Sequence, residues 1–250
     1  MVEVDAPTPL LTGLNNPVGV AVDSTSIYIS DSGNNQVIKV PLAGGATTTL
    51  VSGLNNPAGV AVDGTSVYVS DSGNNRVIKV PLAGGIPTTL AMGLNNPAGV
   101  AVDSTNVYVS DSGHNQVFKV PVAGGATTIL VSGLNNPAGV AVYSTSVYVS
   151  DSGNNKVITV PVAGGVATTL LIVNRPAGLA VDRSGNCYII DSGNSRVLKL
   201  AAGTTTPTTL VSGLNMIKVP VAGGATITLV SGLNPAGVAV DSGGKLYVTA

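Results

Sequence analysis

Carboxylate and amide side chains recur at fixed places along this chain. Five aspartates each begin a turn of the form Asp-Ser-Gly-Asn-Asn or a close variant: Asp31, Asp71, Asp111, Asp151 and Asp191. A second motif, Asn-Asn-Pro, contributes four pairs of amides: Asn15, Asn16, Asn55, Asn56, Asn95, Asn96, Asn135 and Asn136. Amides donate and accept hydrogen bonds, whereas carboxylates accept them. A surface that gathers both kinds of group suits recognition of a carbohydrate or a polar peptide.

A purely local role is the alternative for the same residues. Asn and Asp side chains often bond backbone N–H groups of their own turn, so turn formation alone explains their recurrence. Calcium is a further alternative, because Ca²⁺ is held by six to eight oxygen ligands. Each turn supplies only one carboxylate, so we expect no metal ion and no other cofactor.

Residues suited to catalysis are scarce. The chain has one histidine, His114, one cysteine, Cys187, and one glutamate, Glu3. Cys187 replaces the Val or Ile of other repeats and has no base or cation nearby in the repeat, so we expect a buried small hydrophobe. His114 stands where Asn74 stands in another turn, which indicates a solvated turn residue. No catalytic residues are therefore predicted, and the chain is not expected to be an enzyme.

Cationic side chains follow some of the aspartate turns. Arg76, Lys156 and Arg196 occupy the position after the turn, but Gln36 and Gln116 occupy it in the other two repeats. An Asp–Arg contact here would be structural, and its loss in two repeats indicates that it is not essential.

The elements that must position these side chains are short strands. In the repeat 53–92, apolar or β-branched runs at 60–62, 67–70, 76–80 and 88–90 are separated by Gly, Asn, Asp, Ser and Pro, which form turns. This pattern predicts one four-stranded antiparallel sheet. The first two strands are apolar on both faces, so we expect neighbouring sheets to cover them and the fourth strand to lie outside.

The same unit repeats along the whole chain. Pro17, Pro57, Pro97 and Pro137 are 40 residues apart, and Pro176 follows after 39. A period near 40 with four short strands is typical of a β-propeller blade. We therefore predict an all-β fold, a six-bladed β-propeller of four-stranded antiparallel blades, as one domain over residues 1–250.

The expected repeats cover 13–52, 53–92, 93–132, 133–172 and 173–212, and the last blade combines 233–250 with 1–12. In that last blade, N-terminal strands at 2–4 and 8–11 complete the sheet and close the ring, which removes open sheet edges. Two connections carry the polar residues: the crossover from the fourth strand of one blade to the first strand of the next, and the turn from the second strand to the third. Both connections lie on the same face of such a propeller. Tyr143, which replaces the aspartate of Asp63 and Asp103, is expected on the opposite face.

One segment departs from this pattern. After Asn215 the chain passes directly to a third-strand sequence at 216–220, so the irregular partial repeat 213–232 lacks its two inner strands. It is an insertion beside six blades, the outer half of a seventh blade, or a place where residues are missing from the chain; we favour six blades with an irregular region.

Composition limits the classes of partner. Charged residues are only 9% and the net charge is −1, so no basic surface is available for nucleic acid. No apolar run approaches the roughly 18 residues of a membrane span. Residues 1–4 contain no basic region followed by an apolar stretch, so a signal peptide is absent or has been removed. We expect an extracellular or cell-surface protein that is monomeric or associates weakly with itself.

Two sequence runs resemble a known repeat family. Pro-Ala-Gly-Val-Ala-Val-Asp at 57–63 and Val-Tyr-Val-Ser-Asp-Ser-Gly-Asn-Asn-Arg-Val at 67–77 resemble the NHL repeat. The run 191–203 resembles most closely the extracellular sensor propeller of a mycobacterial receptor serine/threonine kinase. The resemblance implies a binding or sensing module. Related propeller enzymes need several histidines for zinc, or a catalytic Glu or His, which the single His114 and Glu3 do not match.

These observations favour a non-enzymatic binding or sensing propeller that recognises a protein, peptide or glycan on its Asn/Asp-rich face. The first alternative is a structural or self-assembling repeat scaffold, recently amplified or designed, without a dedicated small ligand. The second is a propeller enzyme of the lyase or hydrolase type.

Overall fold

Each repeat folds into a four-stranded antiparallel sheet because its apolar runs are short and turn residues separate them. The computed structural model describes Leu11 and residues 13–212 and 236–249. In the second blade the strands are β5 (Pro57–Val62), β6 (Ser66–Asp71), β7 (Arg76–Pro81) and β8 (Thr88–Met92). A single 3-10 turn, η2 (Ser72–Asn74), joins β6 to β7.

Four other blades repeat this order. Blade one contains β1 (Pro17–Val22), β2 (Ser26–Asp31), η1 (Ser32–Asn34), β3 (Gln36–Pro41) and β4 (Thr48–Ser52). Blade three contains β9 (Pro97–Val102), β10 (Asn106–Asp111), η3 (Ser112–His114), β11 (Gln116–Pro121) and β12 (Thr128–Val131). Blade four contains β13 (Pro137–Tyr143), β14 (Ser146–Asp151), η4 (Ser152–Asn154), β15 (Lys156–Pro161) and β16 (Thr168–Ile172). Blade five contains β17 (Pro176–Val181), β18 (Cys187–Asp191), η5 (Ser192–Asn194), β19 (Arg196–Leu200) and β20 (Thr208–Ser212).

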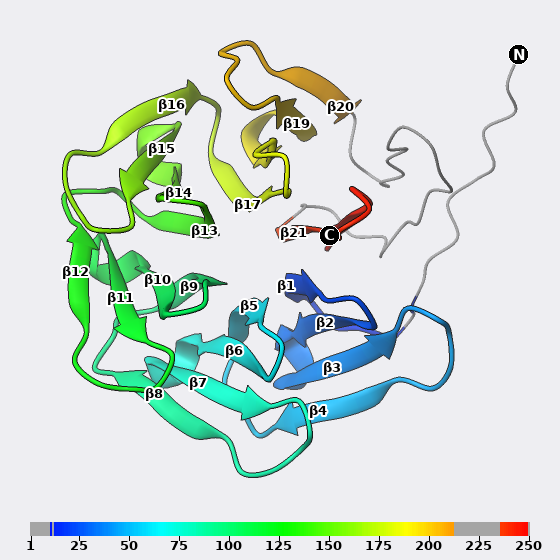
Figure 1. The fold of residues 1–250 in the computed structure, drawn as a ribbon. Helices are drawn as coiled ribbons and strands as arrows, with labels where there is room; N and C mark the ends of the chain where they lie inside the picture. The colour runs from blue at the N-terminus through cyan, green and yellow to red at the C-terminus, as the bar shows by residue number, and fades with distance from the viewer. Residues whose placement is uncertain (1–10, 12, 213–235, 250) are drawn as a thin grey trace, which may run out of the picture.

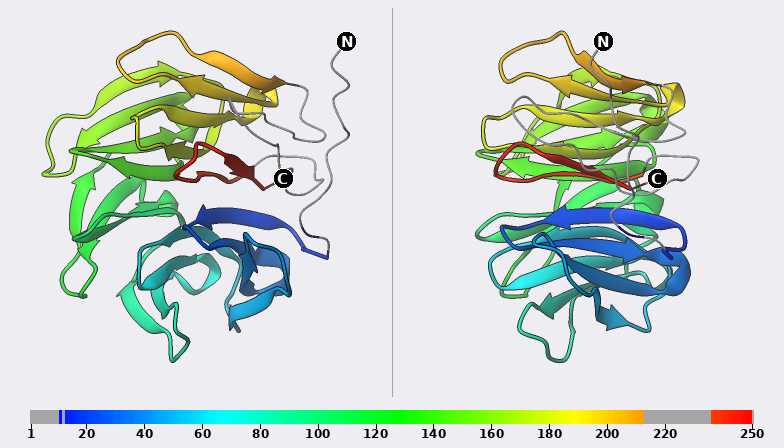
Figure 2. Two further views of the ribbon diagram at one scale, coloured as in Figure 1. Left: turned by 45° about the vertical axis from the view of Figure 1, so that its right-hand side comes forward. Right: turned by 90° about the vertical axis from the view of Figure 1, so that its right-hand side faces the viewer.

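The blades are arranged around an axis lined by their first strands (Figure 1). A two-stranded sheet of β21 (Val238–Val240) and β22 (Leu246–Val248) lies between blade five and blade one, with β21 against both β17 and β1 (Figure 2). Among the described residues, no helix has the length and apolarity needed to cross a membrane.

The predicted six-bladed ring of four-stranded blades is wrong. The described residues form five four-stranded blades, and the sixth sheet has two strands. The reason is that residues 236–249 contain only the first two strands of the repeat. The other two were assigned to residues 1–12, of which the structure describes only Leu11, outside any strand. The predicted N-terminal strand at 2–4, residues 8–10 of the predicted strand at 8–11, and the partial repeat 213–232 lie outside the described residues.

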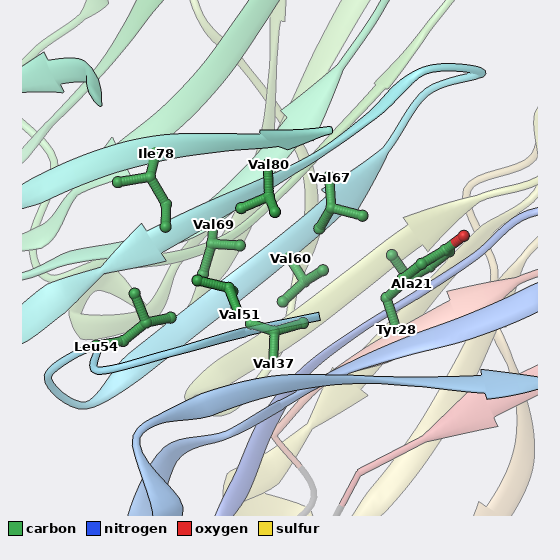
Figure 3. Packing of buried hydrophobic residues seen from close by; sticks show 10 residues of the cluster. All are labelled: Ala21, Tyr28, Val37, Val51, Leu54, Val60, Val67, Val69, Ile78 and Val80. Carbon is green, nitrogen blue, oxygen red and sulfur yellow. The ribbon is translucent and has the colours of Figure 1, made fainter. Parts of the chain in front are cut away.

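The hydrophobic core consists of layers between blades. In β6, all six residues are buried because neighbouring blades cover both faces, as the sequence predicted, whereas most of outer strand β8 is exposed or half-buried. Figure 3 shows one layer, in which Tyr28 and Val37 of blade one pack with Val60, Val69 and Ile78 of blade two. Small branched side chains suffice because every strand contributes to such a layer.

A glycine in each first strand sets how closely the blades approach. The pairing of β5 with β6 shifts register between Pro57 and Val60, which is a β-bulge. Within it, a Cβ on Gly59 would lie 2.2 Å from the backbone oxygen of Ala98 in the next blade. Only glycine fits such an approach. The equivalent glycines are Gly19, Gly99, Gly139, Gly178 and Gly237.

Candidate functional site

The aspartate that ends each second strand is buried. Asp71 has no exposed surface, and its Oδ1 accepts a hydrogen bond from the backbone N–H of Asn55 at 2.7 Å. Its Oδ2 accepts from Asn74 Nδ2 at 2.9 Å and from Arg76 Nε at 2.7 Å. One carboxylate therefore joins the crossover, the turn and the third strand.

The five predicted aspartates all occupy this position. They are almost fully buried, and each accepts a hydrogen bond from a crossover N–H: Asp31 from Asn15, Asp71 from Asn55, Asp111 from Asn95, Asp151 from Asn135 and Asp191 from Asn174. Their carboxylates are engaged within the blade and do not face solvent. They hold the loops in place, so direct contact with a ligand falls to other groups.

The side chain after each turn completes the set of donors. Arg76 and Arg196 pair with their aspartates through Nε, and Lys156 Nζ lies 3.6 Å from Asp151. Gln36 and Gln116 donate at the same place. His114 Nδ1 lies 2.7 Å from Asp111 Oδ2, so this histidine replaces an asparagine of the turn.

The first asparagine of each crossover covers the turn. Asn55 is exposed, its carbonyl accepts a hydrogen bond from Gly73 N–H at 2.8 Å, and its side chain lies over Gly73. A Cβ on Gly73 would lie 2.4 Å from Asn55 Cγ. Asn15, Asn95 and Asn135 pack in the same way. Crossovers and turns thus lie together at one end of the blades, which we call the loop face.

The second asparagine joins one blade to the next. Asn56 has a φ of 49°, in the left-handed region that Asn tolerates, and its N–H donates to Asn35 Oδ1 of blade one at 2.9 Å. Asn96 bonds Asn75 and Asn136 bonds Asn115 likewise. The sequence prediction omitted the acceptors Asn35, Asn75, Asn115 and Asn155. The sequence feature that could have identified them is their place as the last asparagine of each turn, where the backbone has a positive φ.

The structure brings all eight predicted asparagines to the loop face, and all eight are exposed: Asn15, Asn16, Asn55, Asn56, Asn95, Asn96, Asn135 and Asn136. Backbone bonds fix the main chain of seven of these asparagines, so the loops present their side-chain amides at set places on the loop face. Within the described residues, none of these eight side chains makes a hydrogen bond to another group.

A different carboxylate ring lies at the opposite end. Asp63 Oδ1 caps the turn through the N–H groups of Thr65 and Ser66, and its Oδ2 accepts from Tyr68 OH at 2.8 Å. Partial burial raises the pKa of Asp63, but the hydrogen bonds from Thr65, Tyr68 and Ser66 outweigh it and lower the pKa below 3.8. Burial and the neighbouring Asp63 carboxylate raise the pKa of Tyr68. Lys79 Nζ lies 5.6 Å above the Tyr68 ring.

Blade four departs from this arrangement. Tyr143 replaces the aspartate, lies at the end opposite the loop face as predicted, and donates from its hydroxyl to Arg183 O at 3.1 Å. Thr159 stands where the other four-stranded blades have lysine. Blade four therefore lacks both the aspartate and the lysine of this arrangement. Burial, followed by the nearby Cys187 and Tyr143, raises the pKa of Tyr148. Cys187 is 1% exposed, and burial raises the pKa of its thiol to about 12, which describes a packed, unreactive side chain.

The axis itself is apolar near the loop face. An opening of about 210 Å³ is lined by first-strand residues of the five blades and by residues 236–238 at the start of β21, all Gly, Ala, Val or Leu. Within the described part of the chain, no group of three or more His, Cys, Asp or Glu side chains is placed to hold a metal ion.

The comparisons with known proteins agree with this architecture. The model of the NHL repeat matches residues 54–79, 94–120 and 173–200, within the second, third and fifth repeats. No match was found among curated protein sequences.

Among solved structures, a nidogen/laminin complex is similar with a TM-score of 0.73 and 23% identity over 78% of this chain and 80% of that one. A streptogramin B lyase has a TM-score of 0.76 and 11% identity over 97% and 93%. A catalytically inactive virginiamycin B lyase from Staphylococcus aureus with quinupristin has a TM-score of 0.74 and 12% identity over 98% and 94%. At these identities the likeness concerns the fold. The fold defines this chain as a β-propeller, and three of its repeats match the NHL repeat.

Proposed function

We propose that this chain is a non-enzymatic binding module that recognises a protein, peptide or glycan partner on its loop face. The observation that carries the proposal is the ring of exposed asparagine amides, fixed by buried aspartates within blades and by Asn–Asn bonds between blades. Because the loop backbone that carries these amides is already fixed, binding does not require the loops to be ordered first, which favours affinity.

Two further points support a binding role over catalysis. The loop-face aspartates are occupied by structural hydrogen bonds, and the described residues that line the axial opening near the loop face include no ionisable side chain. Acid–base catalysis needs a titratable group free to reach a substrate. The similarity to a nidogen/laminin complex supports a protein partner, and the resemblance of 191–203 to a kinase sensor propeller supports a sensing role in an extracellular setting.

The test exploits the left-handed backbone of the second asparagines. Glycine adopts a positive φ without strain, so the triple variant Asn56→Gly, Asn96→Gly, Asn136→Gly removes three exposed amides and keeps the backbone. Panels of glycans and displayed peptides are screened against the wild-type protein, and the selected ligands are then titrated into the variant. We expect the affinity to fall at least about tenfold, since each lost hydrogen bond contributes about 1 kcal/mol.

The matched control changes the opposite end. The control is the double variant Ser24→Gly, Ser104→Gly. Glycine occurs naturally at the equivalent position of blade two, Gly64, so the change should leave the fold and the loop face unchanged. Equal affinity of the triple variant and the wild-type protein for every selected ligand would exclude the loop face as the binding surface.

A further inference from the structure

The repeat symmetry of the loop face breaks between blades four and five. The crossover 172–176 is one residue shorter than the crossover 132–137, and Ile172 replaces a Ser-Gly pair. At this place an open recess of about 270 Å³ is lined by Asn155, Ile172, Val173, Asn174, Asn194 and Arg196. It combines amide, guanidinium and aliphatic groups.

Hydrogen-bond donors predominate in the recess. Arg196 uses Nε to bond Asp191 Oδ2 at 2.6 Å, and its side chain stays 37% exposed. Within the described residues, its two terminal nitrogens make no hydrogen bond. Asn155 uses Oδ1 to accept from Arg175 N–H at 2.9 Å, and its NH₂ group makes no hydrogen bond to any other described residue. Asn174 Nδ2 lies 3.5 Å from Asn194 Oδ1, a long contact that a ligand can replace.

Charge at this place is also unusual. Asp191 is buried, and both its oxygens accept hydrogen bonds from Asn194 Nδ2 at 3.1 and 2.9 Å. Arg175 stands where other crossovers have asparagine, so the crossover beside the recess carries a second positive charge, which forms no ion pair within the described part of the chain. The loop-face end of blade two has one arginine and one aspartate, whereas that of blade five has two arginines and one aspartate. This excess of positive charge attracts an anion.

One wall of the recess is aliphatic. Ile172 is 72% exposed at the end of β16, whereas Val173 beside it is buried. An exposed isoleucine beside polar donors suits a ligand that carries an aliphatic group next to its polar one.

We propose that this recess binds a small carboxylate-bearing ligand with an aliphatic group beside the carboxylate, an assignment that rests on the loop face being the binding face. The terminal nitrogens of Arg196 donate in parallel to the two carboxylate oxygens, a geometry in which arginine is strongest. The amides of Asn155 and Asn174 donate to the same oxygens, and Ile172 contacts the aliphatic part. A peptide C-terminus and a sugar acid share the carboxylate.

The experiment is an NMR titration of the ¹⁵N-labelled protein with N-acetyl-leucine and, separately, with glucuronate. Their uncharged counterparts, N-acetyl-leucinamide and glucose, serve as references. We expect N-acetyl-leucine to bind with a Kd on the order of 1 mM, a typical value for so small a ligand. The shift changes are expected at Asn155, Ile172–Asn174, Asn194 and Arg196. Weaker binding of glucuronate would identify a peptide end as the source of the carboxylate, and equal binding would contradict the aliphatic contact with Ile172 because glucuronate has no aliphatic group beside its carboxylate.

The decisive variant is Arg196→Gln. Gln36 and Gln116 occupy the same position and donate to their aspartates, so this change preserves the turn. We expect a loss of affinity of at least about tenfold, and the spectrum reports that the fold is intact. Arg76→Gln, the same change in a blade without the recess, is the control and should leave binding unchanged.

Three further results would overturn the assignment: equal binding of N-acetyl-leucinamide and the free acid, equal effects of Arg196→Gln and Arg76→Gln, or no binding of either acid at 50-fold the expected Kd. None of them affects the asparagine rim, which the triple glycine variant tests separately.

Discussion

At the scale of the residue, the buried aspartate explains the loop face. Asp71 gives up hydration entirely, which is favourable only because three donors replace water around it. Its two oxygens serve two directions, one toward the crossover and one toward the turn and third strand. The residue that was expected to contact a ligand is therefore a residue that positions the loops carrying the asparagine amides, which we propose as the contact groups.

Replacing a loop-face aspartate by asparagine tests this role. In Asp71→Asn, the new NH₂ group faces Asn74 Nδ2 and Arg76 Nε, and arginine has no acceptor to offer. We expect a loss of about 3 kcal/mol in the free energy of unfolding. In Asp31→Asn the neighbours are the amides of Asn34 and Gln36, which can turn their oxygens toward the new group, so a loss of about 1 kcal/mol is expected.

Urea denaturation of both variants at neutral pH measures the difference. Equal losses would mean that the cation at position 76 plays no part in holding the turn.

At the scale of the element, the first strand combines a bulge with a glycine. The bulge turns the backbone of Gly59 toward Ala98 O, and the absence of Cβ allows the next blade to close in. The opposite end of the same strand leads to Asp63, whose carboxylate caps the turn and receives the Tyr68 hydroxyl. The first strand of blade two is therefore fixed at one end by its close approach to blade three and at the other end by an aspartate of its own repeat.

A methyl group at the close approach should be costly. Gly59→Ala would place Cβ 2.2 Å from a backbone oxygen, so the blades must separate. We expect a loss of roughly 3 kcal/mol in unfolding free energy. Gly64→Ala is the matched control, because nothing lies within 4 Å of a Cβ there, and it should leave stability within about 1 kcal/mol. Thermal and urea unfolding of both proteins check this, and similar stabilities would contradict the close packing.

The Asp–Tyr pairs predict how stability depends on acid. The pKa of Asp63 is lowered from 3.8 in the folded protein, so it binds protons less readily than in the unfolded chain. Its contribution is present above the unfolded value and is lost as the pH falls through the folded pKa. The pKa values of Asp23, Asp103 and Asp182 are lowered in the same way.

We therefore expect the urea concentration at the unfolding midpoint to decrease when the pH is lowered from 5 to 3. Tyr68→Phe removes one donor to Asp63, so the variant should be less stable at pH 7 and lose less on acidification. An unchanged difference between pH 7 and pH 3 in the variant would contradict this account.

At the scale of the whole molecule, the two-stranded sheet β21–β22 joins the last described blade to the first. Thr249 Oγ1 donates to Val18 O at 2.6 Å and accepts from Gly237 N–H at 2.9 Å, a link between residues 231 positions apart. Ser30 makes the same link from blade one to Ala58 O of blade two. In repeat proteins such contacts between neighbours determine how the units unfold together.

Removing the Thr249 hydroxyl should destabilise the contact between β1 and β21 more than the rest of the molecule. In Thr249→Val the shape is kept and the hydroxyl is lost, which leaves Val18 O and Gly237 N–H without their partner. We expect a cost of about 2 kcal/mol and faster hydrogen exchange in β1 and β21. Ser70→Ala is the control, because Ser70 Oγ has no hydrogen-bond partner among the residues that the structure describes, and it should change stability by less than about 0.5 kcal/mol. Uniform exchange changes across all blades would argue against a local link.

The strand order and the separation of the two ends of each blade were predictable from the sequence. In the repeat 53–92, β-branched runs alternate with Gly, Asn and Pro, and this local pattern predicts both where the strands lie and at which end of the blade each turn falls. The model of the NHL repeat matches residues 54–79 of the same repeat. Bringing the eight crossover asparagines to one face followed from this order alone. The number of complete blades did not, because it depends on which distant segments pair, and the described residues form five four-stranded blades rather than six.

The roles of individual polar residues were decided only by the tertiary structure. Asp71 and Asn56 both belong to turn motifs, yet one is buried within its blade and the other exposed and bonded to the blade before it. Burial and partners across blades are set by the packing of segments about 20 residues or more apart, which a local pattern does not contain. The same holds for the recess at Arg196: one deleted residue in the crossover is visible in the sequence, but the meeting of amides, guanidinium and Ile172 exists only where two blades lie side by side.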